Sequence, residues 1–112
     1  MNTTTTTQTT TLAEQINDLC DAIHGSSLDD KIKAILTKEL RSARFRFNEA
    51  NDEAKAAVFY MSQGTENAAK FVAASNDFEH AAQAARRAAD KMREAEVKFE
   101  YALDMWDALT AE

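Results

Sequence analysis

The spacing of Asp77 and His80 comes nearest to a metal-binding pattern, because a carboxylate and an imidazole three positions apart share one face of a helix. Glu49 and Asp52 are expected at a matching height on a neighbouring helix. Together they would supply half of the ligand set of a carboxylate-bridged metal site in a helical bundle. All four fall at outward positions of the helices assigned below, whereas such a site needs ligands that point into the core. We therefore expect no metal and no other cofactor.

Cys20 is the candidate nucleophile, and His24, four residues later, is the candidate base. No acid or pocket that would orient the histidine is evident, and catalysis by a thiolate needs such a partner. A single cysteine cannot form an internal disulfide, which favours a reducing compartment. The chain also lacks a glycine-rich phosphate loop. We expect no enzymatic activity, and we interpret Cys20 as a small core residue.

The composition predicts long helices. In 112 residues there is no proline and there are only two glycines, so the strongest breaks in helical backbone are nearly missing. The net charge of −6 argues against binding to duplex DNA or to an anionic membrane, which needs surplus Lys and Arg. No stretch approaches the length of a membrane span. Protein partners are therefore favoured over nucleic acid or lipid.

The first eleven residues contain eight threonines and neither the basic nor the apolar part of a signal peptide. Too few apolar side chains are present to offset the entropy of ordering, so residues 1–11 are predicted to form a flexible tail. A Thr-rich leader on a helical chain would suit a structural or accessory component of a bacteriophage. The expected location is the cytoplasm or a viral particle.

Capping patterns divide the remainder into three helices. Thr11 and Glu14 form a capping box, which predicts a short helix over about 12–24. Ser27 and Asp30 predict the start of a second helix, over about 28–63, with Gly64 as its C-terminal stop. A third helix, capped by Thr65, is expected over about 66–110. Residues 12–112 would then form a single helical domain.

Heptad spacing predicts how the two long helices meet. In the third helix, bulky and small residues recur every seven positions: Phe71, Phe78, Ala85, Met92, Phe99 and Trp106. Alanines, with Leu109 last, follow each of them by three, and the second helix repeats the pattern around Leu36, Leu40 and Phe47. A fold at Gly64 pairs residues whose numbers sum to 128, such as Ala50 with Phe78 and Ala57 with Phe71. The predicted fold is all-α: an antiparallel, coiled-coil-like hairpin with an alanine-rich seam, the alternative being one continuous rod.

The short first helix is predicted to pack against a cluster of apolar residues. This cluster combines the start of the second helix with the end of the third. These residues are Leu28, Ile32, Ile35, Phe99, Leu103, Trp106 and Leu109. The rest of an alanine seam buries little apolar area, so the hairpin alone is expected to be marginal. Oligomerisation or a partner would then complete a bundle.

Eleven of the thirteen basic residues lie in the windows 31–46 and 86–98, which the hairpin would bring together as a basic belt beside an acidic tip. The simpler interpretation is a solvated face with ion pairs between successive turns. Residues expected to bind a partner are Phe45, Val58, Phe59, Tyr60, Arg41, Arg44, Arg46, Arg86, Arg87, Tyr101 and Trp106.

Two hypotheses for function follow. The first is a non-enzymatic assembly or adaptor protein that acts through helix packing, alone as a homo-oligomer or with a protein partner. The second is a small acidic inhibitor or modulator of one other protein. A third and weaker one is RNA binding through Arg44, Phe45 and Arg46, against which stand the acidic net charge and the lack of any RNA-binding signature.

Overall fold

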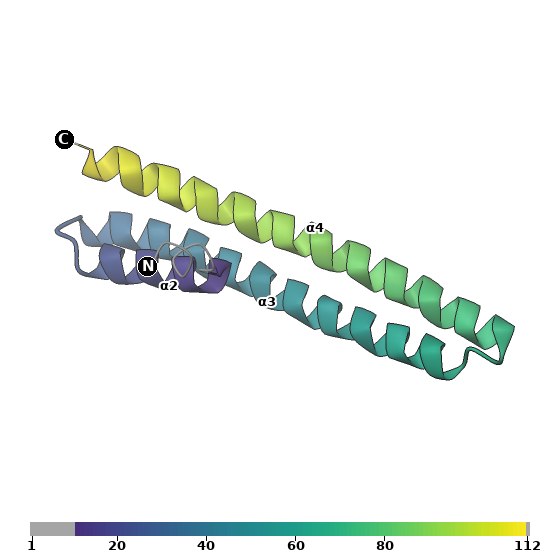
Figure 1. Ribbon diagram of the computed structural model, residues 1–112. Coiled ribbons are helices and arrows are strands. Elements are labelled where there is room, and N and C mark those ends of the chain that lie inside the picture. The colour runs from purple at the N-terminus through teal and green to yellow at the C-terminus, as the bar shows by residue number, and fades with distance from the viewer. Residues whose placement is uncertain (1–10, 112) are drawn as a thin grey trace, which may run out of the picture. The chain divides into compact units, whose positions relative to one another are not determined.

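The computed structural model describes residues 11–111, so the predicted flexible tail, apart from Thr11, lies outside the described residues. The helices are α2 (Leu12–His24), α3 (Asp30–Glu66) and α4 (Phe71–Thr110), and the described part of the chain contains no strand. α3 and α4 pack against each other as an antiparallel pair (Figure 1). This confirms the predicted all-α helical hairpin with a short N-terminal helix.

The chain divides into two compact units, each described by itself. Of the described residues, the three-helix unit comprises 11–45 and 94–111, and it holds α2, the start of α3 and the end of α4. The tip unit comprises Arg46–Arg93, and it holds the end of α3, the turn and the start of α4. Over residues 11–111, no helix combines the length and the hydrophobicity needed to cross a bilayer.

The predicted capping box at the start of α2 is confirmed. The Glu14 backbone N–H donates to the Thr11 hydroxyl oxygen at 3.2 Å, and the Thr11 backbone N–H donates to the Glu14 carboxylate at 2.9 Å. Both donors would otherwise lack a partner within the helix. The helix buries Ile16, Leu19 and Ile23 on one face, at the three-and-four spacing that the sequence shows.

The core of the three-helix unit lies where α2 packs on both long helices. Its buried members are Ile16, Leu19, Ile23, Leu36, Leu40, Ala43, Phe99 and Ala102. Leu28, Ile32, Leu103 and Trp106 pack against them, as expected for the docking of α2. Ile35 and Leu109, which were expected in the same cluster, are instead exposed. This unit therefore has branched aliphatic and aromatic side chains in its interior.

The start of α3 differs from the expected cap. Asp29, not Ser27, caps the helix. The Asp29 carboxylate accepts from the Lys31 backbone N–H at 3.1 Å, and the Asp29 carbonyl accepts from the Lys33 backbone N–H at 2.9 Å. The Ser26 hydroxyl donates to the Ile23 carbonyl and accepts from the Leu28 N–H, so it closes the preceding turn. The helix therefore begins at Asp30, two residues later than predicted.

The prediction that Gly64 ends the helix is wrong. α3 continues through Gly64 to Glu66, and the turn follows at residues 67–70. Thr65 does not cap the next helix, because its hydroxyl donates to the Met61 carbonyl one turn back, at 3.0 Å. The side-chain amide of Asn67 donates to the Asp77 carboxylate at 3.0 Å and ties the turn to α4.

The later turn changes the register of the hairpin. In the tip unit Glu49 faces Lys91, Glu53 faces Arg87 and Tyr60 faces His80, pairs whose numbers sum to 140 rather than the predicted 128. The predicted pairing of Ala57 with Phe71 is therefore wrong, and Phe71 is 82% exposed. The buried residues of the tip unit are small: Ala50, Gly64, Ala74, Ala81 and Ala84.

Candidate interaction surface

Three of the four residues that most resembled a metal site, Asp77, His80 and Glu49, contact other side chains. The Asp77 carboxylate accepts from Asn67, the His80 ring lies 5.2 Å from the Tyr60 ring, and Glu49 is held by two cations. Asp52 is exposed on α3. Across residues 11–111 no group of three or more His, Cys, Asp or Glu residues is placed to hold a metal ion.

Cys20 is half-buried against the core of the three-helix unit. Burial raises the pKa of its thiol, and the neighbouring Asp21 carboxylate adds to the increase, while Arg44 and Arg41 act in the opposite direction. His24 lies at the end of α2, where its backbone carbonyl accepts from the Lys33 ammonium at 3.2 Å. A raised thiol pKa suits packing rather than nucleophilic attack.

Several of the predicted contact residues are exposed, and they are divided between the two units. Phe45 and Tyr101 are exposed in the three-helix unit, and Val58 and Phe59 in the tip unit. Tyr60 is half-buried between the Phe59 and His80 rings. Trp106 is partly buried and packs against the core of the three-helix unit.

The predicted basic residues divide between the two units, and many make specific contacts. In the three-helix unit Arg44 donates to the Asn17 side chain, while Arg41 is exposed. In the tip unit Arg46 pairs with Glu49 at 2.9 Å and Arg87 pairs with Glu53 at 3.0 Å. Arg86 is exposed. Of these contacts, only the pair of Arg46 with Glu49 joins successive turns of one helix, as the simpler interpretation predicts, whereas the contacts of Arg44 and Arg87 join different helices.

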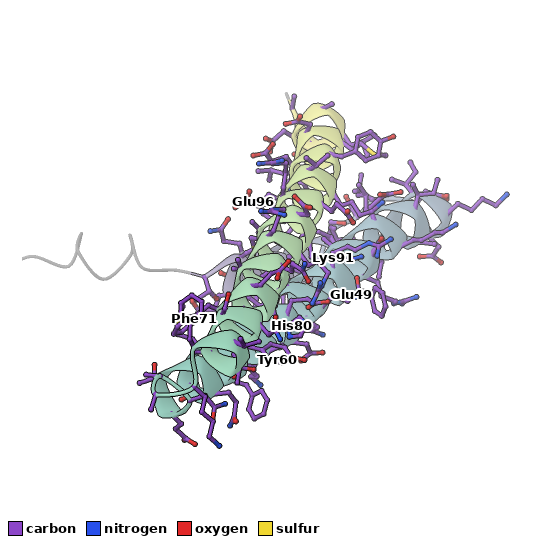
Figure 2. The ribbon with its side chains drawn as sticks, turned by 90° about the vertical axis from the view of Figure 1, so that its right-hand side faces the viewer. Glu49, Tyr60, Phe71, His80, Lys91 and Glu96 are labelled. Atoms are coloured by element: carbon purple, nitrogen blue, oxygen red, sulfur yellow. The ribbon has the colours of Figure 1, made fainter. Side chains whose placement is uncertain are left out.

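One face of the tip unit is polar. Glu49 accepts from Arg46 at 2.9 Å and lies 3.5 Å from the Lys91 ammonium (Figure 2). The hydrogen bond from Arg46 is the largest cause of the lowered pKa of Glu49, desolvation opposes it, and the charge of Lys91 lowers the pKa further. Glu53 with Arg87, and Tyr60 with His80, continue this face toward the turn.

The opposite face of the tip unit is apolar. On α3 the polar-face residues Glu53 and Tyr60 lie to one side of the buried line through Ala50 and Gly64, and helical geometry puts Val58 on the other side. Met61 lies there too. The same reasoning on α4 puts Lys91 and His80 on one side, and Phe71 and Phe78 on the other. Because the ion pairs join the polar sides, the apolar sides also share a face.

Figure 2 agrees with this assignment, since Phe71 lies across α4 from the labelled His80 and Lys91. We call Val58, Met61, Phe71 and Phe78 the apolar face. Their exposed fractions are 69%, 53%, 82% and 41%, so each leaves a large part of its hydrocarbon surface in water. Exposed apolar residues that cluster in this way are typical of interaction sites.

Shallow hollows lie between the bulky side chains of the apolar face. One is lined by Ala57, Val58, Met61, Ser62 and Thr65 on α3. Another is lined by Ala68, Phe71, Ala74, Ser75 and Phe78 on α4. Protruding side chains therefore alternate with small ones. Packed helices have the same alternation, because the ridges of one helix fit into the grooves of the other.

Sequence reasoning missed this face because it assigned Met61, Phe71 and Phe78 to the seam. The assignment followed from heptad spacing, and the fold at Gly64 set the pairing, whereas the later turn rotates the seam of the tip unit toward Asp77, Ala84 and Lys91. Asn67, a residue common in turns, is the signal that could have placed the turn later. Of the apolar face, only Val58 was among the predicted contact residues.

Comparison with protein-family models, with curated proteins and with solved structures found no match to this chain.

Proposed function

We propose that this protein is a non-enzymatic assembly or adaptor component that acts by helix–helix packing through the apolar face of its tip unit. The observation that carries the proposal is the contrast between interior and surface in this unit. Its buried residues are alanines and a glycine, while Val58, Met61, Phe71 and Phe78 are exposed on one side. Large apolar side chains stabilise a protein only when something covers them.

In the three-helix unit, another helix already covers apolar residues of α4. In the seven-residue repeat of α4, Phe99 is buried in the core that α2 helps to form and Trp106 packs against that core, whereas Phe71 and Phe78, earlier in the same repeat, are exposed. An added helical surface on the apolar face would give the tip unit the kind of core that α2 gives the three-helix unit. The phage origin, and the location in cytoplasm or virion, stay predictions from the sequence.

Site-specific photo-crosslinking tests the proposal. A photoreactive phenylalanine analogue at Phe71 should form adducts in cells that naturally contain the protein, because the ring would lie against a partner. The matched control is the same analogue at Val72, which is 71% exposed but lies about 100° further round α4. Equal crosslinking at the two positions, or none at Phe71, would contradict the proposal.

A further inference from the structure

We propose that the partner of the apolar face is a second copy of this chain, which pairs with the first through the same face to form a four-helix arrangement of two tip units. This inference rests on the proposed function, since it identifies the partner at that surface. It assigns the contact to Val58, Met61, Phe71 and Phe78, and not to the outward Phe59 and Val72.

Charge supports a partner with an equally apolar surface. The apolar face is formed by residues 57–62 of α3 and 71–78 of α4. No charged side chain lines the hollows of this face, whose lining residues are Ala, Val, Met, Phe, Ser and Thr. Charged residues stand at its border, Lys55 on α3 and Glu79 on α4, and they have opposite signs. Two copies brought together therefore meet without like charges at the centre, where repulsion would be costly.

The shape of the face is self-complementary. Phe71 and Phe78 stand beside the hollow that contains Ala74, and Val58 and Met61 beside the hollow that contains Ala57. In a two-fold arrangement each surface is its own partner, so a face needs both projections and recesses, and this one has both. The large side chains of one copy can enter the hollows of the other, as in other helical bundles.

The exposed area is on the scale that a dimer needs. If a fully exposed aromatic side chain presents roughly 200 Å², Phe71 and Phe78 together leave about 250 Å² of apolar surface in water. A standard interface takes about 800 Å² from each partner, of which roughly 450 Å² is apolar. The two rings supply about half of that, and Val58, Met61 and the intervening alanines lie alongside to supply more.

Other segments of the chain are poor candidates for the cover. α2 is already packed in the three-helix unit through Ile16, Leu19 and Ile23. Residues 1–10 have Met1 as their single apolar side chain, and the others are Thr, Asn and Gln. A second copy, by contrast, brings four large apolar side chains in a matching arrangement.

Sedimentation equilibrium of the full chain, from about 1 to 100 μM, tests the pairing over the range of Kd values typical of modest interfaces. We expect a species of twice the 12.4 kDa chain mass. Phe71→Glu should weaken the dimer by at least about tenfold, because it places a charge within the apolar face. Met61→Lys should do the same, and Val72→Glu, on the outer side of α4, should leave the dimer unchanged.

Circular dichroism should show equal helix content in all variants, since each replaced side chain is more than half exposed. A wild-type chain that is monomeric throughout, a larger closed oligomer, or equal weakening by Phe71→Glu and Val72→Glu would overturn self-pairing. A monomer that still crosslinks to another protein specifically at Phe71 overturns self-pairing alone. Loss of position-specific crosslinking at Phe71 overturns the proposed function as well.

Discussion

Glu49 illustrates how one side chain stabilises a face that has no large buried residue. Its carboxylate accepts a hydrogen bond from Arg46 and lies near Lys91, and together these lower its pKa below the ordinary 4.5. A carboxylate with a lowered pKa in the folded state contributes stability that is fully present above its unfolded pKa. That stability is lost as the pH falls through the folded pKa.

Replacement of Glu49 should therefore matter at neutral pH and not in acid. We expect Glu49→Gln to lower the free energy of unfolding at neutral pH, with the difference from wild type shrinking as pH falls below about 4.5. Urea titrations across this range measure the effect. Arg46→Gln is the control, since it removes the largest cause and should reduce the pH dependence. A difference that is independent of pH would show that Glu49 is not held by these cations.

The environment of Cys20 predicts low reactivity. Burial, assisted by Asp21, raises the pKa of the thiol, so less thiolate is present at mildly alkaline pH than in a free cysteine. We expect iodoacetamide to alkylate the folded protein more slowly than it alkylates a small thiol. The two rates should approach each other after unfolding in urea. Folded protein that reacts as fast as the small thiol would contradict this account.

At the scale of helices, the sequence predicted the elements better than their register. Capping residues placed α2, and the scarcity of Gly and Pro predicted both long helices. The register failed because it depended on one glycine. A glycine inside a helix costs about 1 kcal/mol relative to alanine, so a stop at Gly64 was reasonable. In the folded protein α3 nevertheless continues through Gly64. The Phe78 ring occupies the space beside Gly64 that a Cβ would take.

The contact between Gly64 and Phe78 gives a prediction for the hairpin. A Cβ at Gly64 would overlap the Phe78 ring, so Gly64→Ala should be unfavourable while the ring is present. In the Phe78→Ala background the same change should stabilise α3 by about 0.5–1 kcal/mol, the ordinary gain for a glycine inside a helix. Chemical denaturation of the four proteins measures the coupling. Effects that add within a few tenths of a kcal/mol would contradict this register.

The candidate site shows why surface chemistry is harder to predict than helices. Exposed residues such as Val58 and Phe59 could be recognised from their outward heptad positions. Phe71 could not, because an apolar residue at heptad spacing looks the same whether it faces the partner helix or solvent. Phe78 does both, since its ring lies against Gly64 of α3 while 41% of the residue is exposed. Only the position of the turn distinguishes the two cases, and the local signals at residues 63–67 allow more than one.

At the scale of the whole molecule, the two units differ in what they bury. The three-helix unit buries Ile16, Ile23, Leu36 and Leu40, whereas the fully or nearly buried positions of the tip unit are alanines and Gly64. Burial of a large aliphatic side chain contributes roughly 1.5–3 kcal/mol, and an alanine much less. The three-helix unit should accordingly be the more stable of the two.

Hydrogen exchange of dilute protein checks this difference. Amides at 16–23, 36–43 and 95–102 should exchange more slowly than those at 54–66 and 71–81, because local opening exposes less apolar surface in the tip unit. Uniform protection along α3 and α4 would mean that the alanine seam is as stable as the larger core.

Intermolecular nuclear Overhauser effects test most directly the proposed pairing of two copies through the apolar face. In an equal mixture of isotopically labelled and unlabelled protein at high concentration, isotope-filtered spectra detect only contacts between copies. We predict contacts from the rings of Phe71 and Phe78 to methyl groups of Val58, Met61 or the neighbouring alanines of the other chain. Contacts that instead involve Phe59 or Val72, or no contacts between copies, would contradict the account.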